Sequence, residues 1–354
     1  MADKRILLDC TQQEIASLLA EWNQPGYRAK QVFRWLHQGA SFDQMANLPK
    51  ELRKRLGEAF LDMPLTCQRE AASAKDDTVK FLFACQDGHL VEGVLMRHHY
   101  GYTLCVSTQV GCAMGCLFCA STLEGCVRNL SAGEMLAQVL LANRFLGDKG
   151  HVGRVVLMGS GEPLANYEGT LRFLRLLNDP EGLNISLRNI SLSTCGLVPE
   201  IGRLAEEGLP VTLSISLHAP SDSIRRQLMP IARRYPLPEL MAAVRAYVKK
   251  TGRRVVFEYA LIDGYNCSVS HARALARLVA GLQCHVNLIP LNDVPERNLA
   301  AAAPGQVQAF LKALEEMNVS ATCRREMGAD IAGACGQLRR QHLKSRPKVD
   351  RIGE

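Results

Sequence analysis

The sequence predicts an α/β fold in which six strand–helix units form a parallel sheet curled into a partial or full (β/α)6 barrel, preceded by a small N-terminal helical domain. From residue 104 onward, short apolar runs alternate with stretches of helical periodicity. Such alternation is typical of parallel sheets, whose active sites lie at the carboxyl ends of the strands. Residues 1–75 instead contain short helical stretches with their own capping and breaking signals, which indicates a separate accessory domain.

The composition sets broad limits. The chain has 354 residues, of which 47% are hydrophobic and 22% charged, enough for one large domain and a smaller one. It contains no run of about eighteen apolar residues, and its first residues form no apolar signal segment, so we expect a cytoplasmic protein without membrane contact. Thirteen cysteines, an odd number without a secretory signal, argue for reduced thiols, some of which bind metal or react.

The accessory domain, predicted over residues 1–75, contains a capping box formed by Thr11 and Glu14 and a chain break at Pro25-Gly26. Its basic side chains suit a phosphate backbone, although a solvated helix face explains them equally well. The net charge of +7 likewise fits a polyanionic partner without requiring one. Residues 76–103 are predicted as a β-hairpin linker, because an Asp-Gly turn separates two apolar, β-prone runs.

The barrel is predicted over residues 104–325. Its expected strands are residues 104–108, 154–158, 189–194, 211–217, 255–262 and 285–291. Its expected helices are residues 132–145, 167–177, 200–207, 238–250, 270–280 and 306–317. Residues 326–354 follow as a Gly- and Ala-rich loop that carries Cys335 and ends in a basic tail. Such a loop can bring a mobile cysteine over a site that is built elsewhere.

Three cysteines, Cys112, Cys116 and Cys119, follow the first barrel strand in a C-x3-C-x2-C pattern. A mononuclear zinc site usually has four protein ligands, whereas three thiolates on a [4Fe–4S] cluster leave one iron open for a small molecule. A structural zinc with Cys105 or Cys126 as the fourth ligand is the alternative. The position at the catalytic face of a barrel favours the cluster.

Several motifs in a fixed order resemble one family. The cysteine triplet resembles that of radical S-adenosylmethionine (SAM) enzymes, and its surroundings resemble the 23S rRNA/tRNA adenine-C2 methyltransferases of the RlmN type. The match includes PGYRAKQVFRWL, TLCVSTQVGC, FCAST, RNLSAGE, MGSGEP, LSTCGLVP, SISLHAP, VNLIPLN and GADIAGACGQL. Each motif alone is weak, but their order and spacing together are specific. The resemblance implies a radical SAM partial barrel with a [4Fe–4S] cluster and SAM as cofactors.

Position by position, the resemblance implies a set of cofactor-binding residues. Cys112, Cys116 and Cys119 match the cluster ligands. The positions that match SAM contacts are Gly161, Glu162, Ser193, Ser216, Leu217, His218 and Asn292. A carboxylate such as Glu162 can accept a hydrogen bond from the methionine ammonium, and glycines let backbone approach a ligand. Without the resemblance, a Gly-rich turn or a lone histidine at a strand end is more often structural.

The resemblance also implies a two-cysteine mechanism with two SAM molecules per turnover. Adenine C2 has no nucleophilic lone pair, so a direct SN2 transfer cannot methylate it. Cys335 matches the family's methyl acceptor, and Glu92 matches the proposed proton acceptor. Cys105 matches the thiol that releases the RNA from the protein–RNA adduct by forming a disulfide with Cys335. A solvent-facing strand carboxylate is the structural alternative for Glu92. An outside electron donor is required, for which we expect a flavodoxin-type protein.

The implied substrates are an adenosine in the peptidyl transferase centre of 23S rRNA and the adenosine 3′ of the anticodon in some tRNAs, bound by a monomer. The nearest alternative is the adenine-C8 methyltransferase that confers ribosomal antibiotic resistance; Val110 and RNLSAGE favour the C2 branch. A non-catalytic RNA-binding protein with a structural zinc is the alternative from another class. Cys126 and Cys195 are interpreted as incidental thiols, and Cys323 is close enough in sequence to Cys335 for a competing disulfide.

Overall fold

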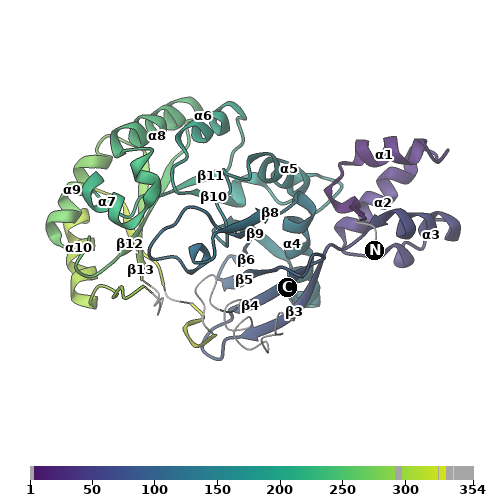
Figure 1. Ribbon diagram of the computed structural model, residues 1–354, viewed down its shortest axis with the longest axis horizontal. Helices are drawn as coiled ribbons and strands as arrows, with labels where there is room; N and C mark the ends of the chain where they lie inside the picture. The colour runs from purple at the N-terminus through teal and green to yellow at the C-terminus, as the bar shows by residue number, and fades with distance from the viewer. Residues whose placement is uncertain (1–3, 292–296, 326, 332–337, 339–354) are drawn as a thin grey trace, which may run out of the picture.

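A curved ten-stranded sheet frames the protein in this computed structural model, which describes residues 4–291, 297–325, 327–331 and 338. The strand order is β14-β13-β12-β11-β10-β9-β6-β5-β4-β3. Most helices lie along the outside of the curve, and the first three form a lobe beside it (Figure 1). The strands are β3 (Leu65–Ala72), β4 (Val79–Cys85), β5 (Leu90–His98), β6 (Gly101–Cys105), β9 (Val152–Leu157), β10 (Ile190–Thr194), β11 (Thr212–Ser216), β12 (Val255–Leu261), β13 (Cys284–Pro290) and β14 (Ala321–Cys323).

The parallel part of the sheet confirms the predicted barrel. Strands β6 and β9 to β14 pair in parallel, and all six predicted strand–helix units are present. The strand β6 begins at Gly101 instead of residue 104, and a helix that the pattern does not predict, α7, follows β11. The helices are α4 (Ala132–Leu146), α5 (Tyr167–Asn178), α6 (Val198–Glu206), α7 (Asp222–Leu228), α8 (Leu237–Thr251), α9 (Val269–Val279) and α10 (Pro304–Glu316).

Strands β3, β4 and β5 extend the barrel sheet beyond β6 by antiparallel pairing. The predicted hairpin is present between β4 and β5, with Gly88 at φ +82° in its turn. It continues the sheet and is therefore more than the linker expected over residues 76–103. The strand β3 also lies inside the region expected to be helical. Its side chains are mostly exposed and polar, so no apolar run signals this edge strand.

The N-terminal lobe consists of α1 (Gln12–Ala20), α2 (Tyr27–His37) and α3 (Lys50–Ala59), with a short parallel pair formed by β1 (Arg5–Ile6) and β2 (Phe60–Leu61). The predicted capping box is confirmed, because Glu14 N donates to Thr11 Oγ1 at 3.2 Å and Thr11 N donates to Glu14 Oε2 at 2.7 Å. Arg172 of α5 donates to both oxygens of the same carboxylate at 2.8 and 2.9 Å. The lobe is thereby fixed to the outer helices of the barrel.

None of the helices in the described ranges is both long enough and apolar enough to cross a bilayer.

Candidate active site

A cavity of about 260 Å³ lies at the carboxyl ends of the parallel strands, and all three clustered cysteines line it. Five of the seven positions that match SAM contacts line the same cavity: Gly161, Glu162, Ser193, Ser216 and His218. These residues come from the ends of β9, β10 and β11 and from the loop after β7 (Gln109–Gly111). The fold therefore brings the predicted cluster ligands and most of the predicted SAM contacts into one space.

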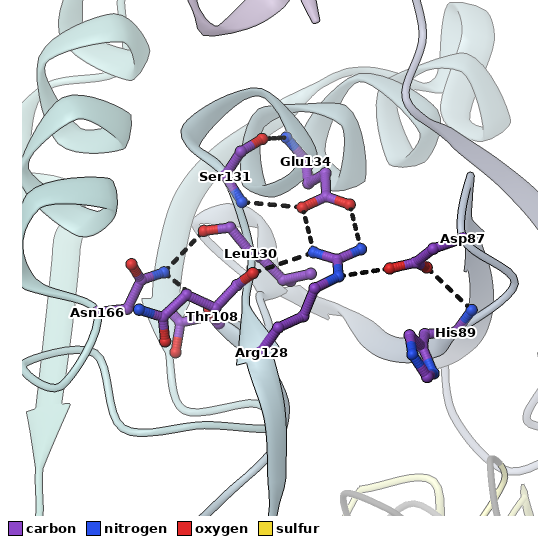
Figure 2. Close-up of polar contacts among 9 residues, drawn as sticks. Asp87, His89, Thr108, Arg128, Leu130, Ser131, Glu134 and Asn166 are labelled. Atoms are coloured by element: carbon purple, nitrogen blue, oxygen red, sulfur yellow. Dashed lines mark hydrogen bonds and ion pairs between the residues drawn. The ribbon is translucent and has the colours of Figure 1, made fainter. Parts of the chain in front are cut away.

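The cysteine loop is closed at its base by main-chain and side-chain bonds. Leu130 N donates to Thr108 O at 3.0 Å, and the Asn166 amide donates to both Thr108 O and Leu130 O at 2.9 and 2.8 Å. Figure 2 shows Asn166 bridging these two carbonyls. Between them, β7 pairs with β8 (Cys126–Asn129). The loop is thus a hairpin with a fixed base, and the cysteines lie in its tip.

Arg128 ties this hairpin to two other elements. Its guanidinium donates to both oxygens of Glu134 at 2.8 Å and also pairs with Asp87 in the β4–β5 turn (Figure 2). Glu134 accepts from Ser131 N at 2.9 Å in the capping box of α4, which confirms the predicted helix start. One arginine therefore links the cysteine hairpin, the helix behind it and the antiparallel extension.

Two glycines in the hairpin have a positive φ that L side chains rarely adopt, and at Gly111 close packing also excludes a side chain. At Gly111, with φ +81°, an added Cβ would lie 2.0 Å from Gly125 O. At Gly115, with φ +69°, it would lie 3.2 Å from Pro230 Cγ, in the short 3-10 helix after α7. Leu117 N also donates to Leu228 O at 2.9 Å, so α7 and the residues after it form the wall behind the cysteines.

The three thiols line one cavity together with the polar ends of β9, β10 and β11. Three thiolates on a four-iron cluster leave one iron open for a small molecule, and the cavity provides space beside the thiols for such a ligand. Burial raises the pKa of Cys112 to about 12 and that of Cys116 further still. A bound metal centre supplies the positive charge that turns such thiols into thiolates.

Glu162 is buried and joins two strand ends. Its Oε2 accepts from Cys195 N at 2.7 Å and its Oε1 from Leu164 N at 3.0 Å. A carboxylate has further lone pairs, so Glu162 can still accept from a cationic ligand in the cavity. The neighbouring Gly161 has φ +113°, and an added Cβ would lie 2.6 Å from Thr108 Oγ1. This glycine is therefore required by packing against the protein itself.

His218 follows β11 in a left-handed conformation, φ +53°, and is buried. Its Nδ1 accepts from Ala260 N at 2.9 Å, so the neutral ring carries its proton on Nε2. Burial, with a smaller effect of Arg225, lowers its pKa to about 3, and the ring stays neutral at pH 7. Phe118 of the cysteine loop packs edge-on against the ring, with centroids 4.5 Å apart. The preceding Leu217 is fully buried.

Glu92 and Cys105 lie on neighbouring strands of the antiparallel extension. Cys105 is directly opposite Val94, and Glu92 is two residues from Val94 on β5, so both side chains share one face. Both are buried, which contradicts the solvent-facing alternative for Glu92. Cys105 belongs to the same apolar cluster as Met158, which lines the cavity. Lys80 forms an ion pair with Glu92 at 3.1 Å.

The cavity wall also contains polar residues that the sequence does not single out as functional: Glu258, Arg324, Cys195, Thr122 and Thr194. Glu258 on β12 is buried and accepts from Asn287 Nδ2 at 2.7 Å, and burial raises its pKa. Arg324 follows β14, and Cys195 follows β10. A lone carboxylate inside the apolar run VVFEYALI is the signal that could have identified Glu258.

Cys335 and Asn292 lie outside the described residues, so their roles, and the possible disulfides of Cys335 with Cys105 or Cys323, stay predictions. Described residues on either side of Cys335 contact the antiparallel extension. The Asp330 carboxylate accepts from Ser73 Oγ at 2.7 Å, in the β3–β4 turn. Leu338 packs against Leu82, which is directly opposite Glu92 in the sheet register.

Comparisons with known proteins cover both the lobe and the barrel. The radical SAM superfamily matches residues 106–269, and the ribosomal RNA large subunit methyltransferase N-terminal domain matches residues 6–61. An Alkaliphilus metalliredigens protein named probable dual-specificity RNA methyltransferase RlmN is 49% identical over 349 residues, 98% of this chain and 99% of its own length. A Symbiobacterium thermophilum protein of the same name is 51% identical over 338 residues, 94% of this chain and 91% of its own length.

The crystal structure of a radical SAM methyltransferase from Sphaerobacter thermophilus is 47% identical and has a TM-score of 0.92, covering 94% of this chain and 98% of that chain. The iron–sulfur cluster and SAM that define radical SAM enzymes agree with the cavity of the present protein, which is lined by three thiols and by polar strand ends. The chain therefore belongs to the RlmN-type family of radical SAM methyltransferases, whose cofactors are a [4Fe–4S] cluster and SAM.

Proposed function

We propose that the protein methylates C2 of adenosine in RNA, in the peptidyl transferase centre of 23S rRNA and 3′ of the anticodon in tRNA. The name of its relatives and the matched N-terminal domain support RNA as the substrate. The observation that carries the proposal is the burial of Glu92 and Cys105 together, on one face beside the cofactor cavity. Neither is among the proposed cofactor-binding residues, but a base and a second thiol are what a covalent C2 methylation requires.

In this proposal, Cys112, Cys116 and Cys119 hold the cluster, while Glu162 and His218 bind SAM with the serines at the ends of β10 and β11. When bound, these cofactors supply the methyl group and the one-electron chemistry that activates a methyl C–H bond. Asn292 and the backbone of Leu217 complete the set by resemblance. Leu217 N and O are already bonded to Glu258 and Arg225, so a direct role of this residue has the least structural support.

The chain's own residues would then act in sequence. The Cys335 thiolate would accept the methyl group. After the S-methyl group has given up a hydrogen atom, its carbon would bond to C2 and hold the RNA covalently on Cys335. Glu92 would take the C2 proton, and the unpaired electron of the adduct would be returned to the bound cofactors. The Cys105 thiolate would then attack the Cys335 sulfur and break its bond to the methylene carbon, which takes up a proton, so that the methylated base leaves and a disulfide remains. A flavodoxin-type donor returns both thiols to the reduced state. Leu338, three residues after Cys335 in sequence, packs on the face that carries Glu92, which supports this assignment.

Mass spectrometry of nucleosides from digested rRNA and tRNA of a deletion strain tests the proposal. The proposal predicts that 2-methyladenosine is missing and returns when the wild-type chain is expressed. An 8-methyladenosine that depends on this chain would support the C8 alternative. Persistence of 2-methyladenosine in a strain without a paralogue would contradict the assignment.

A further inference from the structure

Arg225, on α7, is fully buried behind the cysteine hairpin. Its guanidinium donates to four backbone carbonyls, at 2.7 Å to Cys195, 3.2 Å to Leu217 and 3.4 Å each to Ser216 and Tyr235. All four acceptors are neutral, so among the described residues no bonded carboxylate balances the positive charge. A buried charge without an opposite charge is costly to maintain.

The surroundings of Arg225 show where an opposite charge would arise. The ionisable groups whose negative form would stabilise the charged guanidinium are Cys195, Cys116 and Asp222. Of these, Asp222 is only half-buried and already accepts from Leu237 N at 2.8 Å. Cys116 is a proposed cluster ligand and packs in one apolar cluster with residues of α7 and with Cys195. The buried cation therefore lies next to the proposed cluster site.

We propose that Arg225 is the internal counter-charge of the iron–sulfur cluster and the residue that positions the strand ends around it. A [4Fe–4S] centre bound by thiolates carries net negative charge, and reduction adds one more, so a buried cation nearby favours binding and reduction. The inference rests on the proposed ligands Cys112, Cys116 and Cys119.

The carbonyl contacts give Arg225 a second effect. They join the end of β10, at Cys195, to the end of β11, at Ser216 and Leu217. The proposed SAM contacts Ser193, Ser216 and His218 lie on these two segments. Arg225 is not among the described residues that line the cavity, so it is a positioning residue that acts through its charge and through the strand ends.

The test compares the anaerobically reconstituted full-length protein with Arg225→Gln, Arg225→Lys and Arg226→Gln. Arg226→Gln is a matched control, because it removes the same charge from the next, exposed position of α7. The iron content of each protein is measured first, and the cluster midpoint potential is then determined by a titration followed by electron paramagnetic resonance. A wild-type protein without a four-iron cluster would contradict the proposed cluster site itself, which is distinguishable from failure of this inference.

We expect Arg225→Gln to make cluster reduction at least about tenfold less favourable, a fall of about 59 mV for one electron. Arg225→Lys keeps the charge and should stay close to the wild-type potential, as should Arg226→Gln. If Arg225→Gln fails to hold iron, retained iron and potential in Arg225→Lys support the inference. The inference is overturned if the Arg225→Gln protein binds its full iron content and has an unchanged midpoint potential. It is also overturned if Arg225→Lys loses its iron as completely as Arg225→Gln does.

Discussion

Lys80 on β4 and Glu92 on β5 form an ion pair in the interior of the sheet extension, with Nζ 3.1 Å from Oε2 and exposures of 0% and 4%. They are not directly opposite in the register, since Lys80 faces Val94 and Glu92 faces Leu82, but all four side chains share one face. The proposed base thus has a fixed cationic neighbour beside the cavity.

Removing that neighbour should destabilise the fold. In Lys80→Met, a buried carboxylate loses its ammonium partner, and we expect the free energy of unfolding to fall by about 3–5 kcal/mol. Urea unfolding of the cluster-free protein measures this free energy. The double variant Lys80→Met/Glu92→Gln should recover a large part of the lost free energy of unfolding, because both charges of the pair are then removed. Simple additivity of the two single changes would show that the pair is not coupled.

His37 should make the stability depend on pH. Its ring stacks on Phe33 with centroids 4.0 Å apart, and neither ring nitrogen has a hydrogen-bond partner in the described structure. Burial lowers its pKa from 6.5 to about 4. Between these values the unfolded chain binds a proton that the folded chain does not, so stability present above pH 6.5 is lost as the pH falls toward 4.

Between pH 7 and pH 5, His37 should lower the free energy of unfolding by about 2 kcal/mol. His218 contributes with the same sign, because its folded pKa is about 3. Urea midpoints at the two pH values should therefore show a smaller drop for His37→Leu than for the wild type. The exposed His151→Leu is the control and should keep the full drop. Equal drops in wild type and His37→Leu would refute the burial argument.

Gly161 should tolerate no side chain. In Gly161→Ala the new Cβ would lie 2.6 Å from Thr108 Oγ1 and 2.7 Å from Gln109 N, at a φ of +113°. We expect the free energy of unfolding, measured by urea unfolding, to fall by about 2–4 kcal/mol. SAM binding, measured by calorimetry, should also become weaker. Gly153→Ala lies on β9, the strand before Gly161, and has no atom within 4 Å of the added Cβ, so it should change neither quantity by much. A stable, SAM-binding Gly161→Ala protein would contradict this account of the turn.

The barrel could be predicted from the sequence because its strands and helices are marked by local sequence patterns. Apolar runs define β9 to β13, and capping residues such as Ser131 define helix starts. The edge strand β3 and the helix α7 lack such signals: the first is mostly exposed, and the second has only seven residues. The motifs located the cavity residues, but they did so through resemblance and not through periodicity.

The interactions that were missed depend on register and on three-dimensional packing. Lys80 and Glu92 are each a single charge in an apolar run, and only the pairing of β4 with β5 brings them together. Arg225 contacts the ends of β10 and β11 at Cys195 and Ser216, which precede it by 30 and 9 residues in the sequence. The packing that requires a glycine at position 161 could not be predicted from the sequence either, because the atoms that exclude a Cβ there belong to residues 108 and 109.

The central claim, that two cysteines carry the methyl transfer, is tested most directly by isolating RNA bound to Cys105→Ala. The variant is expressed in cells, and digested protein–RNA complexes are analysed by mass spectrometry, with Cys126→Ala as the matched control. The account predicts a covalent adduct between Cys335 and an adenosine in Cys105→Ala, and free 2-methyladenosine with the control. Release of 2-methyladenosine by Cys105→Ala at the wild-type rate, without an adduct, would contradict it.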